Sequence, residues 1–143
     1  MPRVIDFTLT FPYFESTLNE PIRLPRVPVR FLNLEDRSQP ADLNMLVDSG
    51  ADVTSVSTDL IESLSIDVDL LEITEAGGVG GVTRGYRHES MPIVLGGVLV
   101  LCPVLFIPDL PLPLLGREGV FDRFCFAFEQ HAWSIHVVES DAS

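Results

Sequence analysis

Residues 46–52 read Leu-Val-Asp-Ser-Gly-Ala-Asp and continue an almost entirely apolar run that begins at Leu43. A short apolar run of this kind predicts a strand buried on both faces, which would deliver the carboxylate of Asp48 to the edge of a core. Gly50 permits a tight turn and the close approach of another backbone, and the Ser49 hydroxyl can fix that turn. Alone, Asp-Ser-Gly is a weak signal, because many turns use these residues.

Two more motifs lie downstream of this tripeptide. Residues 76–82 read Ala-Gly-Gly-Val-Gly-Gly-Val and stand between two segments with strand composition. Residues 114–117 read Leu-Leu-Gly-Arg and combine an apolar pair with a glycine at the expected start of a helix. Because glycine adopts conformations that other residues avoid, the first motif predicts a hairpin with a flexible tip.

The rest of the chain favours many short strands, because Gly and Pro punctuate short β-branched runs throughout. Short helices are expected at Thr58–Leu64, capped by Thr58, and at Arg117–Phe124. We predict a single domain over residues 1–143, with residues 1–25 as an N-terminal extension and residues 26–138 as the core. The expected strands and hairpins are Val4–Phe11, Val27–Leu34, Leu43–Val47, Val53–Ser57, Glu72–His88, Met91–Leu95, Val98–Ile107, Phe124–Phe128 and Trp133–Val138.

In their order and spacing, the three motifs resemble the retropepsin family of retroviral-type aspartic peptidases. The resemblance covers Leu43 to about Val138. It implies an all-β, retropepsin-like closed barrel or β-sandwich with one or two short helices, assembled as a homodimer. The longer N-terminal region and the C-terminal hairpin are more similar to cellular and bacterial dimeric members than to the viral enzymes.

The resemblance also assigns roles to individual residues. Asp48 looks like the catalytic acid, and Ser49 keeps the hydroxyl of the family's Thr or Ser. Four residues are expected to support the active site: Ser49, Gly50, Asp52 and Arg117. Eight residues are expected to bind substrate, from the Asp48 turn, the glycine-rich flap and the pocket walls: Gly50, Ala51, Asp52, Gly77, Gly78, Val79, Leu112 and Leu114.

Peptide hydrolysis by this chemistry needs two carboxylates around one water, one ionised and one protonated. Two acids about 3 Å apart do not both ionise readily, so they share a proton. The chain contains Asp-Ser-Gly or Asp-Thr-Gly only once, so a two-fold axis through Asp48 must supply the second carboxylate. We therefore expect a homodimeric aspartic endopeptidase that is inhibited by pepstatin-type compounds and cleaves extended, largely apolar peptides. The alternative is a catalytically weak dimerisation or peptide-binding module with the same fold.

Composition limits the other functions. The formal net charge of −12 argues against nucleic acid and against an anionic membrane surface as partners. The two cysteines form no CxxC pair, which favours a reduced compartment. Since no signal-peptide core or bilayer-length apolar run is present, we expect a cytoplasmic protein.

Three other chemistries find no support in the residue patterns. The glycine-rich segment is not GxGxxG and is followed by no GK[ST], so a phosphate-binding loop is disfavoured. His88, His131 and His136 lack metal-ligand spacing, and no G-x-S-x-G elbow is present. We therefore expect neither a metal nor a cofactor.

Overall fold

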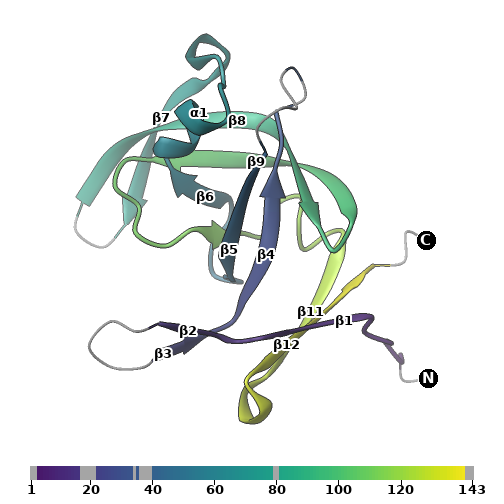
Figure 1. Cartoon of the computed structure of the whole chain (residues 1–143). Coiled ribbons are helices and arrows are strands. Elements are labelled where there is room, and N and C mark those ends of the chain that lie inside the picture. Colours follow the sequence, from purple (N-terminus) through teal and green to yellow (C-terminus); the bar gives the residue numbers. More distant parts are fainter. Residues whose placement is uncertain (1–2, 17–21, 34, 36–39, 79–80, 141–143) are drawn as a thin grey trace.

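The computed structural model describes residues 3–16, 22–33, 35, 40–78 and 81–140. The described chain is almost entirely β-structure, with one short α-helix, α1 (Asp59–Ser63), and two 3-10 turns, η1 (Val68–Leu70) and η2 (Gln130–Ala132) (Figure 1). The strands are β1 (Leu9–Pro12), β2 (Phe14–Ser16), β3 (Ile22–Leu24), β4 (Arg26–Phe31), β5 (Ala41–Val47), β6 (Thr54–Ser57), β7 (Glu72–Gly78), β8 (Gly81–Leu95), β9 (Val98–Ile107), β10 (Leu114–Leu115), β11 (Phe124–Glu129) and β12 (Ser134–Glu139).

Six strands form a closed barrel. Neighbouring strands follow the order β4-β5-β10-β6-β9-β8, and an additional pairing between β8 and β4 closes the ring. The strand β8 can take part twice because it is long: Tyr86–His88 and Met91–Leu95 pair with β9 on either side of a register shift, and Ile93 and Val94 also pair with β4. The all-β closed barrel expected from the sequence is confirmed.

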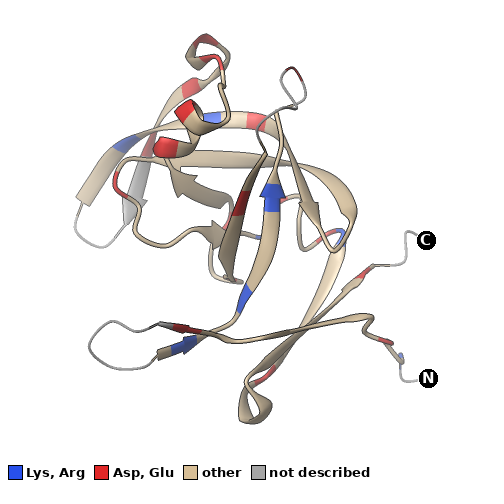
Figure 2. Ribbon diagram, viewed as in Figure 1, with Lys and Arg blue, Asp and Glu red and all other residues tan. Residues whose placement is uncertain are grey.

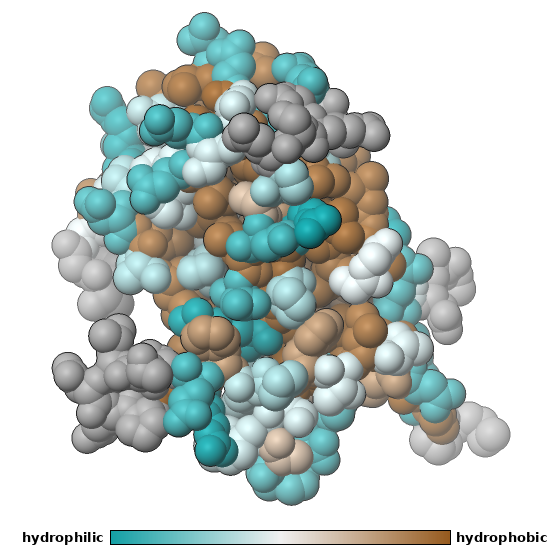
Figure 3. Space-filling view, in the orientation of Figure 1, coloured by the Kyte–Doolittle hydropathy of each residue, from teal (hydrophilic) through white to brown (hydrophobic). Residues whose placement is uncertain are grey.

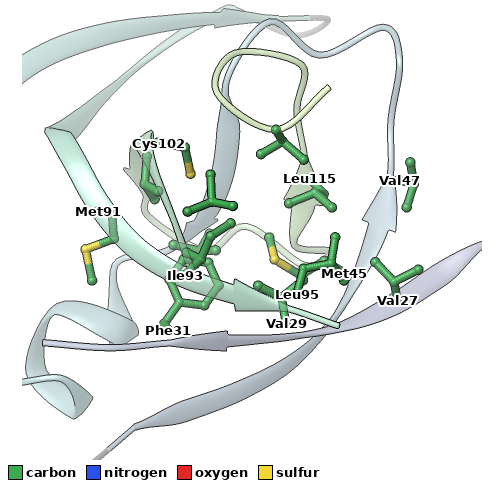
Figure 4. Close-up of a cluster of buried hydrophobic side chains, with 14 of the residues drawn as sticks. Val27, Val29, Phe31, Met45, Val47, Met91, Ile93, Leu95, Cys102 and Leu115 are labelled. Atoms are coloured by element: carbon green, nitrogen blue, oxygen red, sulfur yellow. The ribbon is translucent and has the colours of Figure 1, made fainter. Parts of the chain in front are cut away.

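The barrel encloses one apolar core. Side chains alternate inward and outward along β4, so that Val27, Val29 and Phe31 are buried while Pro28 and Arg30 are exposed. Figure 4 shows these three residues converging with side chains from the other barrel strands: Met45, Val47, Met91, Ile93, Leu95, Cys102 and Leu115. Burial of this much apolar surface is the main force that holds the barrel together.

A second, smaller sheet packs below the barrel in the view of Figure 1. Its strand order is β1-β12-β11, with all pairings antiparallel. The core-facing side of this sheet is lined by Leu9, Phe11, Ile135 and Val137. Residues 9–13 are therefore packed into the fold, and Tyr13 is buried. In Figure 3, apolar side chains gather over the barrel, whereas the surface over the smaller sheet is largely polar.

Several details of local structure differ from the expectations; the strand expected at Val4–Phe11, for example, begins only at Leu9. The helix expected at 117–124 is absent: residues 117–123 form hydrogen-bonded turns and Phe124 begins β11, because Gly119 adopts a φ of 77° that ends any helical run. The strand β5 is buried on both faces only in part, since Asn44 is exposed on the outside of the barrel. The Thr58 side chain makes no capping bond; the Ser57 hydroxyl accepts the Asp59 N–H instead, at 3.3 Å.

Burial also controls the chemistry of Cys102, a core residue of β9. Removal from water raises the pKa of the Cys102 thiol to about 12, so almost none of it is thiolate near pH 8. We expect iodoacetamide to alkylate Cys102 at least about 100-fold more slowly in the folded chain than in urea. Mass spectrometry of peptic peptides would measure both rates. Equal rates in the folded and unfolded chain would contradict the burial of this thiol.

Candidate active site

Asp48 directly follows β5, at the end of the barrel where the chain turns toward β6. Its backbone N–H donates to the carbonyl oxygen of Leu115 at 3.0 Å, and its own carbonyl accepts the Ala51 N–H at 3.2 Å. Its carboxylate oxygen Oδ1 accepts the N–H of Gly50 at 2.9 Å. The carboxylate is thus held by the backbone of its own turn, while Ser49 and Gly50 remain exposed beside it.

The strand β10 fixes this turn from the other side. It lies between β5 and β6, parallel to β5 with Leu115 opposite Val47, and antiparallel to β6 with Leu114 opposite Ser55. The residues on both sides of the turn are therefore clamped to one inserted strand. The insertion depends on pairing between residues of β10 and β5 that are more than sixty positions apart in the sequence. The close packing of the barrel then holds the inserted strand in place.

Gly116 is required where β10 leaves the sheet. A Cβ atom at this position would lie 2.4 Å from the backbone carbon of Val53 and 2.7 Å from the Thr54 nitrogen. The N–H of Gly116 donates to the Thr54 hydroxyl at 3.1 Å, and Thr54 is fully buried. Thr54 was not identified from the sequence. A hydroxyl side chain in a strand that is predicted to be buried could have identified Thr54 as a structural hydrogen-bonding residue, because buried polar groups need partners.

Asp52 and Arg117 form an ion pair next to the Asp48 turn. The backbone aligns them, because the Arg117 N–H donates to the Ala51 carbonyl at 3.0 Å and the Glu118 N–H donates to the Asp52 carbonyl at 2.9 Å. Both side chains are exposed, so the pair itself adds little to stability. Its contribution is geometric, since it ties the turn to the segment that follows β10.

The expected substrate-binding residues fall on three segments. Gly50, Ala51 and Asp52 belong to the Asp48 turn, and Leu112 and Leu114 are half-buried in and before β10. Gly77 and Gly78 end β7, opposite Val82 and Gly81 of β8, in a hairpin that projects from the barrel (Figure 1). Val79 lies outside the described residues.

His88 and His136 form hydrogen bonds away from this turn. The Nδ1 atom of His88 accepts the Ser90 N–H at 3.1 Å, and burial lowers the His88 pKa, partly offset by the neighbouring Glu89 carboxylate. His136 bridges Thr10 and Glu129 across the smaller sheet, at 2.8 Å to each. The hydrogen bond from His136 lowers the pKa of Glu129.

In the described part of the chain, no helix has the length and apolar character needed to cross a membrane.

No match to a curated protein was found. A family model described as "Aspartyl protease" matches residues 27–118, which run from the first barrel strand through the Asp48 turn to the residue after Arg117. That match spans more than half of the chain and includes every element that fixes the turn. The chain belongs to the aspartyl protease family, of the retropepsin-like type.

Proposed function

We propose that this protein is an aspartic endopeptidase in which Asp48 and the Asp48 of a second copy activate one water across a homodimer axis. The observation that carries the proposal is the presentation of one carboxylate per chain at the end of the barrel. Its position is set by backbone hydrogen bonds to Leu115, Gly50 and Ala51. A carboxylate fixed in this way loses little conformational entropy when it is brought next to the Asp48 carboxylate of the second copy and a water molecule.

In the proposed reaction, the ionised carboxylate accepts a proton from the water as the water oxygen attacks the scissile carbonyl carbon. The protonated carboxyl donates a hydrogen bond to the carbonyl oxygen and stabilises the negative charge that develops there. The carbon–nitrogen bond then breaks as a proton reaches the leaving amine. The pair returns to its singly protonated state, so the reaction consumes one water and needs no covalent intermediate.

The smaller sheet offers a surface for the second copy. Among the described residues, β11 pairs only with β12, so one edge of β11 has no strand beside it. An unpaired edge of six residues is a template for strand addition. Because two copies related by a two-fold axis use the same patch, pairing of this edge with its twin would extend one sheet through the dimer.

A bound peptide would lie extended between the Asp48 turn and the β7–β8 flap. In this proposal Gly50, Ala51 and Asp52 bond its backbone, and Leu112 and Leu114 contact its side chains. The glycines at the end of β7 suit a lid that opens and closes.

Cys102 and Cys125 are both free, which supports a reduced compartment such as the cytoplasm.

Cleavage of an unbiased peptide library and of denatured casein, at acid and neutral pH, tests this proposal. We expect cuts between apolar residues, with pepstatin abolishing them, from a protein shown to be dimeric by ultracentrifugation. Charged residues required on both sides of the cut would contradict the apolar groove. A verified dimer that cleaves nothing at any pH would favour a peptide-binding module.

A further inference from the structure

A cavity of about 140 Å³ lies where the β7–β8 hairpin leaves the barrel. Its walls come from the segment that follows β4, from the η1 turn and from the register shift in β8 between His88 and Met91. We call it the root cavity, because η1 ends at Leu70, just before β7 begins at Glu72, and β8 supplies the opposite wall. No residue of the Asp48 turn lines it.

Hydrogen bonds fix the walls of the root cavity. The Nδ2 atom of Asn33 donates to the carbonyl oxygen of Leu64, at the end of α1, at 2.8 Å. The N–H of Leu32 donates to the carbonyl oxygen of Pro92 at 3.1 Å and so joins the end of β4 to β8. On η1, the Oδ1 atom of Asp67 accepts the N–H of the residue two positions further along at 3.0 Å. The cavity is therefore preformed, which lowers the cost of binding a ligand.

Part of the root cavity is apolar. The apolar side chains that line it belong to Leu32, Ile66, Leu70, Met91 and Pro92. Met91 is buried in the core, whereas Leu70 is 63% exposed, so an apolar occupant would remove Leu70 from water. A cavity of about 150 Å³ with apolar walls is known to hold a ligand the size of benzene. The root cavity is thus large enough for an aliphatic group of about six heavy atoms.

The charged groups of the root cavity are acidic. Glu35 and Asp67 line it, and neither forms an ion pair with any described residue. Among the described lining residues there is no Lys or Arg. Burial lowers the pKa of His88, so its imidazole is neutral near pH 7 and does not repel a cation. Figure 2 shows further acidic residues on α1 and on the segment that joins α1 to β7. The field at the cavity therefore favours a positive charge.

We propose that the root cavity binds an aliphatic ammonium group, with its alkyl chain against Leu70 and Ile66 and its nitrogen beside the carboxylates of Asp67 and Glu35. This ligand matches the cavity in size, in apolar surface and in charge. Two sources supply the same chemistry, a free aliphatic amine and the lysine side chain of another protein. The site depends neither on the homodimer nor on the peptidase reaction, because it shares no residue with the Asp48 turn.

Titration of the ¹⁵N-labelled full chain with n-pentylamine, at pH 7 and constant ionic strength, tests the site. We expect saturable changes in the backbone N–H signals of Asn33, Leu70 and Ser90, with a dissociation constant of about 1 mM. The signals of Gly50 and Ala51 should show no saturable change. n-Pentanol lacks the charge and methylammonium lacks the alkyl chain, so each should bind at least about tenfold more weakly. If either bound as tightly as n-pentylamine, the proposed recognition would be wrong.

Removing the two charges isolates their part in binding. The double variant Glu35→Gln, Asp67→Asn should raise the dissociation constant of n-pentylamine at least about tenfold, and the new amide oxygen at position 67 can still accept the η1 N–H that Asp67 accepts. The matched control is Asp59→Asn, Glu62→Gln on α1, which removes the same charge from residues that do not line the cavity. That control should change the dissociation constant less than about twofold.

The apolar wall has its own matched pair on η1. Leu70 lines the cavity, whereas Val68, which is 50% exposed on the same turn, does not. Leu70→Ala should weaken n-pentylamine binding at least about threefold, and Val68→Ala should leave it unchanged. Because both side chains are exposed, neither change should unfold the chain, and far-ultraviolet circular dichroism would establish this for every variant.

The remaining outcomes either support the site or overturn it. Signal changes that do not saturate, or that saturate only at the Asp48 turn, would overturn it, as would control variants that weaken binding as much as the cavity variants. Saturable binding that is lost only in the cavity variants would support it. Titrations with 1,5-diaminopentane and with N-acetyl-lysine methylamide then distinguish the sources: tighter binding of the first assigns a free amine, and tighter binding of the second assigns a lysine side chain.

Discussion

Replacing Asp48 by asparagine is expected to lower kcat/KM for a cleaved peptide by at least about 10³-fold, because the amide neither accepts the proton of the water nor shares a proton with its twin. Asparagine matches aspartate in size, and its side-chain oxygen can still accept the Gly50 N–H that Asp48 accepts at 2.9 Å. The fold and the dimer should therefore survive. Steady-state kinetics, with ultracentrifugation of the same sample, would measure both.

The matched control for this variant is Asp109→Asn. Asp109 is exposed, lies in the turn after β9 and has a φ of 56°, a conformation that asparagine tolerates well. The same change of charge at this position should leave kcat/KM at the wild-type value. If Asp48→Asn turned over peptide as fast as Asp109→Asn, Asp48 would have no part in the chemistry.

Gly116→Ala is expected to cost about 3 kcal/mol of unfolding free energy, because the new methyl group has no space. It would meet backbone atoms of Val53 and Thr54 at 2.4 to 2.7 Å, and backbone in a closed barrel gives way less readily than a side chain. A loss of this size would lower Tm by about 10 °C in a domain of this length. Displacement of Arg117 should reduce activity as well.

Gly97→Ala separates this steric effect from the ordinary cost of losing a glycine. Gly97 has a φ of 79°, and nothing lies within 4 Å of a Cβ built there. Only backbone strain of about 1 to 2 kcal/mol is expected at this position. Differential scanning calorimetry of the two variants should find Gly116→Ala clearly the less stable. The reverse order would mean that β10 is not inserted beside Val53 as described.

Local chemistry explains why much of the fold could be predicted from the sequence. The Gly96-Gly97 pair between two apolar runs predicts a tight hairpin, and both glycines do adopt positive φ values, 57° and 79°. The glycine-rich stretch after Glu72 likewise joins the paired strands β7 and β8. In both cases the residues that predict the hairpin lie within a few positions of the strands that the hairpin joins.

Features that depend on distant partners could not be predicted in this way. The insertion of β10 between β5 and β6 is set by pairing across the chain, and nothing within residues 114–117 encodes it. The N–H of Gly116 and the hydroxyl of Thr54 meet only because that insertion occurs. The expected helix at 117–124 failed for a local reason, since Gly119 takes a positive φ against the β-strand that carries Cys102.

Mixing wild-type and Asp48→Asn chains tests the central claim most directly. If two Asp48 side chains form one site, a mixed dimer holds a single carboxylate and is inactive, so activity falls with the square of the wild-type fraction. After co-refolding of equal amounts, total activity should be about a quarter of that of wild type at the same total concentration. A value of about a half, proportional to the wild-type fraction, would mean that each chain hydrolyses peptides with its own Asp48 alone.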